Sequence, residues 1–116
     1  MTNYNDLTDE QIDIKVTILE LRKKYPDAKH IEADPDMSIV WVHTFGHTSY
    51  PIIHATSSWS DMGPIILTNR ISLSAARDGK WSASTNDTRW KDNLTFDLNP
   101  LRAAAIVYLM IKENSK

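Results

Sequence analysis

The chain has 116 residues, with 13 basic and 15 acidic side chains and a formal net charge of −2. A chain of this length forms one domain with its own core, and the absence of cysteine excludes disulfides, thiolate metal sites and a cysteine nucleophile. A duplex-DNA binder usually carries a basic stripe, so the balanced charge makes nucleic acid an unexpected partner.

The first predicted element is a helix over residues 9–24. Thr8, with Gln11 three positions later, forms the pattern of a capping box. Acidic residues follow the cap, where the helix dipole favours them. Apolar residues recur at helical spacing from Ile12 to Leu21 and form a wide face. Basic residues and then a proline end the segment.

An antiparallel hairpin is expected next. Two β-rich runs, residues 30–33 and 38–44, flank the turn sequence Asp34-Pro35-Asp36. The second run has two faces, with Ile39, Trp41 and His43 on one and Val40 and Val42 on the other. Bulky side chains on both faces predict a central strand.

The middle of the chain is expected to contain short elements. Residues 50–55 favour a short strand. Residues 60–67 indicate a helix entered through a Ser or Asp cap, with Pro64 accepted only in its first turn. Three further strands are predicted, over residues 70–74, 80–84 and 94–98. An Asp-Gly turn separates the first two, and a polar loop at 85–93 precedes the last.

The last helix is the most strongly indicated. Asn99 is a good N-cap and Pro100 suits the first helical position. Leu101 to Ile111 then carry a single charge, and a helix that is apolar nearly all round is buried. Its full apolar circumference predicts a homo-oligomer, most simply a dimer. The run is far too short to span a bilayer, which needs about 20 residues.

Helices and strands alternate without a βαβ rhythm. Residues 1–116 are therefore expected to form a single α+β domain, in which a small antiparallel sheet packs with an N-terminal helix, a short middle helix and a buried C-terminal helix. The first residues have neither the basic start nor the apolar run of a secretion signal. We therefore expect a cytoplasmic protein without membrane contact.

Trp59 and Asp61 are candidate ligand-binding residues. Trp59 follows a polar loop and precedes a helix start, where its ring can be half exposed and can stack on a ligand. The free N–H groups of that helix start can bind an anion. Asp61 would compete with the anion, and the structural alternative is that it caps the helix.

Arg102 is a further candidate. An arginine near the start of an apolar helix, at the dipole end that disfavours positive charge, needs a partner. That partner is either a buried Asp97 or Asp61, or the phosphate or carboxylate of a ligand. Arg70 and Trp90 can add charge and stacking surface to the same ligand-binding site, although sequence alone does not bring them together.

Catalytic and metal motifs are missing from the sequence. No nucleophile elbow, S-x-x-K motif or phosphate-binding glycine loop occurs. His43 and His47 have a zinc-like spacing of four, but they straddle a strand end without an obvious third ligand. His30 and His54 stand alone. We therefore expect no catalytic residue, no metal and no cofactor.

Two stretches carry a family resemblance. Residues 59–66, with Ile71 and Leu73 after them, resemble the middle of the phage NinX family, and residues 99–110 resemble its C-terminal signature. The opening residues 6–12 are similar as well, whereas residues 25–57 and 75–93 are not recognised. The resemblance implies a small accessory product of a tailed phage or prophage, made in the bacterial cell. Where such proteins often carry a cysteine before the tryptophan, this chain has Thr-Ser-Ser, which argues against a thiol or metal role.

The expected function is non-enzymatic binding. A phage accessory protein with this tryptophan and arginine content is expected to counter host defence by sequestering a nucleotide-derived signalling molecule. The alternative is direct inhibition of a host protein through an exposed apolar patch. A small nucleotide hydrolase is the third hypothesis.

Overall fold

The computed structural model describes residues 3–85 and 94–114. Within these residues, three α-helices and six strands confirm the α+β class, but the strands form two three-stranded antiparallel sheets instead of one. The helices are α1 (Asp9–Lys24), α2 (Trp59–Thr68) and α3 (Pro100–Asn114). The strands are β1 (His30–Asp34), β2 (Ile39–His43), β3 (His47–Pro51), β4 (Ile71–Ala75), β5 (Trp81–Thr85) and β6 (Leu94–Asp97).

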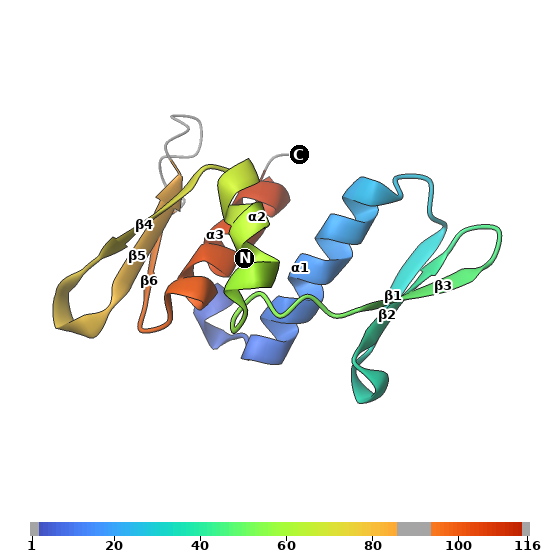
Figure 1. Cartoon of the computed structure of the whole chain (residues 1–116), viewed down its shortest axis with the longest axis horizontal. Helices are drawn as coiled ribbons and strands as arrows, with labels where there is room; N and C mark the ends of the chain where they lie inside the picture. Colours follow the sequence, from blue (N-terminus) through green and yellow to red (C-terminus); the bar gives the residue numbers. More distant parts are fainter. Residues whose placement is uncertain (1–2, 86–93, 115–116) are drawn as a thin grey trace.

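The two sheets lie at opposite ends of an elongated molecule, with the helices between them (Figure 1). The sheet β1-β2-β3 packs on α1, and the sheet β4-β5-β6 packs on α3. Helix α1 has an apolar face wide enough to serve two cores. Ile12 and Val16 belong to the core shared with α2, α3 and β4–β5, whereas Leu21 belongs to the core under β1–β3.

The predicted start of α1 is confirmed in detail. The N–H of Gln11 donates to Thr8 Oγ1 at 3.1 Å, and the Gln11 side-chain oxygen accepts from the N–H of Thr8 at 2.8 Å. Two of the N–H groups that a helix start leaves unpaired are thereby satisfied. Helix α1 spans Asp9–Lys24, which are the bounds that the sequence predicts.

The first hairpin is confirmed, with β2 as the central strand. The third strand differs from the expectation, because β3 ends at Pro51 and residues 52–55 are not a strand. Two of the next N–H groups go to side chains: Ile53 donates to Thr17 Oγ1 at 2.8 Å and His54 donates to Asp61 Oδ2 at 2.9 Å. Because these two N–H groups donate to side chains, they do not pair with a neighbouring strand, and the segment leaves the sheet.

Helix α2 begins one residue earlier than predicted, with Ser58 as its cap. Pro64 is therefore inside the helix and not in the first turn, and that part of the prediction is wrong. Proline removes the hydrogen bond to the carbonyl four residues before it. That residue, Ser60, is exposed, as is Pro64, so water can satisfy the freed carbonyl.

Helix α3 is the centre of the larger core. Residues 103–109 are fully buried, and α3 contacts α1, α2 and the sheet β4-β5-β6. Because the domain itself covers α3, this helix no longer supports the predicted homo-oligomer, which stays a prediction. No helix within residues 3–85 and 94–114 is long and apolar enough to cross a membrane.

Candidate functional site

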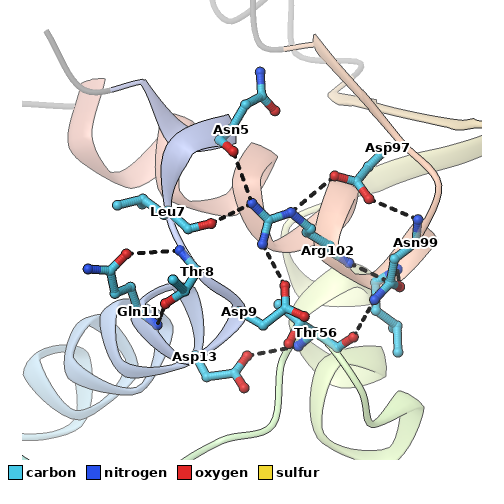
Figure 2. A network of polar contacts seen from close by, with 11 residues as sticks. Asn5, Leu7, Thr8, Asp9, Gln11, Asp13, Thr56, Asp97, Asn99 and Arg102 are labelled. Carbon is cyan, nitrogen blue, oxygen red and sulfur yellow. Dashed lines mark hydrogen bonds and ion pairs between the residues drawn. The ribbon is translucent and has the colours of Figure 1, made fainter.

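Arg102 is committed to contacts within the chain, as Figure 2 shows. Its Nε donates to Asp97 Oδ2 at 3.1 Å, its Nη1 to Asp9 Oδ1 at 2.5 Å, and its Nη2 to the carbonyl of Leu7 at 2.6 Å and, at 3.4 Å, to that of Asn5. The side chain is 14% exposed. Of the two predicted alternatives the structure contains the buried pair with Asp97, and the arginine ties the N-terminal segment to α3.

A second network lies beside the first (Figure 2). The N–H of Thr56 donates to Asp13 Oδ1 at 2.9 Å, and the Thr56 carbonyl accepts from Asn99 Nδ2 at 2.6 Å. Burial raises the pKa of Asp13, although the hydrogen bond from Thr56 acts in the opposite direction. The segment before α2 is therefore fixed to both α1 and α3.

The other residues predicted to bind a ligand are not gathered into one site. Trp59 is the first residue of α2 and is 56% exposed. Asp61 accepts from the N–H of His54, and the cap of α2 is Ser58, so the predicted capping role of Asp61 is wrong. Arg70 is exposed beyond the other end of α2, about 15 Å from Trp59 along a ten-residue helix. Trp90 lies outside the described residues.

A cleft that the sequence did not indicate runs between α1 and the chain that leaves β3. Its volume is about 530 Å³, within the roughly 300–1,000 Å³ of ordinary ligand sites. The residues that line this cleft, called the α1 cleft below, are Thr17, Glu20, Leu21, Lys23, Lys24, Tyr50, Pro51 and Ile53.

The walls of the α1 cleft are mostly apolar, and Lys23 and Lys24 also line it. The ammonium group of Lys24 lies 5.5 Å from the centroids of both the Tyr25 and the Tyr50 ring, a cation–π distance. The two tyrosine hydroxyls hydrogen-bond to each other, and this bond is the main reason why the pKa of Tyr50 is raised. The ring of Tyr50 is thereby held in place beside Lys24.

Glu20, the carboxylate among the described residues that line the α1 cleft, is paired. Glu20 accepts a hydrogen bond from the hydroxyl of Tyr108, and burial together with this bond raises the pKa of Tyr108 well above its ordinary value. This bond holds the Glu20 carboxylate against Tyr108, and the two lysines outnumber this acidic side chain in the cleft lining. The cleft therefore offers an apolar wall, a fixed aromatic ring and the positive charges of Lys23 and Lys24.

Sequence reasoning missed this site because its parts are far apart in the chain. Lys23 and Lys24 fit their ordinary role at the C-terminal end of a helix, and Tyr50 is 26 residues further on. No local pattern links them. No three His, Asp or Glu side chains among the described residues form a group that could hold a metal ion by themselves.

A family model described as Bacteriophage P22, NinX matches residues 3–112. No curated protein matches the chain.

Proposed function

The chain belongs to the bacteriophage P22 NinX family, and from this premise we propose that this phage accessory protein sequesters a nucleotide-derived signalling molecule of the host in the α1 cleft. The observation that carries the proposal is the combination of the Tyr50 ring, the apolar wall and the two lysines in one cleft of suitable volume. This moves the predicted binding site away from Arg102, whose guanidinium donates within the chain.

The chemistry of a nucleotide matches the α1 cleft in two ways. A base has a flat face that stacks on an aromatic ring, which contributes about 1–3 kcal/mol per base. Its phosphates are anions, and lysine binds phosphate as a point charge. Tyr50 and Lys24 supply the two groups side by side, because the ammonium lies over the ring.

We infer binding without turnover from the contacts that already use two polar side chains of the cleft. Among the described residues that line it, Glu20 is bonded to the hydroxyl of Tyr108. The hydroxyl of Thr17 is also in use, since it donates to the carbonyl of Asp13 and accepts from the N–H of Ile53. Both side chains are therefore engaged in contacts within the chain. We therefore propose that the ligand is held and not hydrolysed.

The test is calorimetric titration with cyclic dinucleotides and ADP-ribose. We expect one compound to bind at one site per chain, and to be recovered intact after incubation with the protein. Substitution of both Lys23→Ala and Lys24→Ala should weaken binding at least tenfold. Arg77→Ala combined with Lys80→Ala, both exposed between β4 and β5, is the control that removes an equal charge elsewhere. The proposal is wrong if no compound binds, or if the control weakens binding equally.

Inhibition of a host protein is the second candidate. It is favoured by apolar side chains that are exposed on and just after β6, which pairs only with β5 among the described strands. Leu94 is 46% exposed, Phe96 52% and Leu98 69%. An exposed apolar strand at a sheet edge can pair with a partner. Specific capture of one host protein, abolished by Phe96→Ser but not by Lys24→Ala, would favour this function.

A further inference from the structure

The outer face of the sheet β1-β2-β3 brings three histidines side by side. His30, His43 and His47 are direct cross-strand partners on β1, β2 and β3. The ring centroids are 5.6 Å apart for His30 and His43, and 4.5 Å apart for His43 and His47. The sequence spacing suggested neither the inclusion of His30 nor a carboxylate neighbour.

Glu32 fixes the proton on one of these rings. His43 Nε2 lies 3.0 Å from Glu32 Oε1, and His30 Nε2 lies 3.4 Å from Glu32 Oε2. A carboxylate oxygen accepts a hydrogen bond and does not donate one. His43 Nε2 must therefore carry the proton, and in a neutral imidazole the other nitrogen, Nδ1, is then a lone pair.

That lone pair points at a second imidazole nitrogen. His43 Nδ1 and His47 Nδ1 face each other. Either His47 donates a proton to His43, or both nitrogens present lone pairs to a cation that replaces the hydrogen bond. A carboxylate that accepts from the far nitrogen of a ligating histidine is the usual outer partner of a metal site, because it fixes the ring and raises its basicity.

We propose that His43 Nδ1 and His47 Nδ1 chelate a divalent late transition-metal ion, with Glu32 as the residue that positions His43. An open hollow of about 250 Å³ lined by Glu32, Trp41, His43 and His47 leaves room for the water molecules that complete the coordination. Two imidazole ligands favour copper over nickel and zinc. This inference is independent of the α1 cleft, whose lining includes none of these residues.

The experiment is calorimetric titration of the full chain with Ni²⁺, a probe that binds imidazole and does not oxidise the protein. We expect one ion per chain, and a loss of affinity of about 100-fold for His47→Ala, because the second ligand of a chelate adds roughly 10²- to 10⁴-fold. His54→Ala is the control, since His54 is exposed and lies outside the hollow. Glu32→Gln should weaken Ni²⁺ binding by roughly 10- to 100-fold if Glu32 positions His43.

A readout without metal tests the same geometry. Long-range ¹⁵N–¹H spectra should show the proton of neutral His43 on Nε2. Circular dichroism of His47→Ala should match that of the wild type, because the exposed side chain supports no core. The proposal is overturned if Ni²⁺ binds the wild type no more tightly than His47→Ala, if His54→Ala loses as much affinity, or if His43 carries its proton on Nδ1.

Discussion

Replacement of Arg102 by methionine should destabilise the protein by about 3 kcal/mol. Hydrogen bonds to charged groups contribute about 1.5–3 kcal/mol each. The two strongest here join the guanidinium to Asp97, which is 20% exposed, and to the Leu7 carbonyl. The bond to Asp9 adds at most about 1 kcal/mol, because that carboxylate is 62% exposed and screened by water.

The two strong bonds together contribute about 3–6 kcal/mol, and we expect the loss of stability to lie at the lower end of this range. When the arginine is removed, Asp97 still accepts from the N–H of Asn99 at 2.9 Å, so its charge is not left without a partner. The methionine side chain also preserves part of the packing along α3. A loss of about 3 kcal/mol is a large share of the roughly 5–15 kcal/mol that stabilises a domain.

Urea denaturation, followed by tryptophan fluorescence and circular dichroism, measures this loss. With a slope of about 1.5 kcal/mol per molar urea, the midpoint for Arg102→Met should fall by about 2 M. Asp9→Asn is the matched control and should cost less than about 1 kcal/mol. The structural role of the arginine is refuted if the free energy of unfolding of Arg102→Met lies within about 1 kcal/mol of the wild-type value. It is also refuted if the control Asp9→Asn costs as much as Arg102→Met.

Three further substitutions test the packing and the buried network. Asp13→Asn should leave the protein at least as stable at pH 7, because Asn keeps an oxygen to accept from Thr56 and removes a buried charge. Since burial raises the pKa of Asp13 in the folded state from its value of 3.8, the aspartate's favourable contribution is complete below 3.8 and is lost as pH rises through the folded-state pKa. The advantage of Asp13→Asn in urea melts should therefore vanish below pH 3.8, and lower stability at pH 7 would contradict it. Asn99→Ala should cost about 2 kcal/mol in the same assay, since it removes the α3 cap and the donor to the Thr56 carbonyl; no measurable loss would show that the cap is dispensable. Ala104→Leu should cost about 3 kcal/mol or prevent folding, because Ala104 is fully buried in the larger core; a stable variant would mean that the core has spare volume.

The sequence by itself determined the features that depend on neighbouring residues. The cap of α1 at Thr8 and Gln11, and that of α3 at Asn99, were predictable because a cap is a hydrogen bond over two or three residues. The alternation along β2 predicted its faces and its central position for a similar reason, since a period of two is a local property. The resemblance of both ends and the middle of the chain to the NinX family is confirmed.

Helix α2 marks the limit of local rules. Its local signals begin at Ser60 and predict that Pro64 lies in a first turn. The cap is Ser58, and the helix continues through the proline. Burial of Met62 and Ile65 against α3 offsets the lost hydrogen bond, and that contribution depends on a helix about 40 residues further along the chain.

Only the tertiary structure decided which distant groups meet. Arg102 had two predicted carboxylate partners, and packing of the N-terminal segment on α3 selected Asp97 and added Asp9. The division of the strands into two sheets placed α1 between two cores. The histidine row on β1–β3 arises from the register of the two strand pairs. The α1 cleft arises where α1 meets the chain that leaves β3, and such packing depends on burial of apolar surface, which has no sequence period to read.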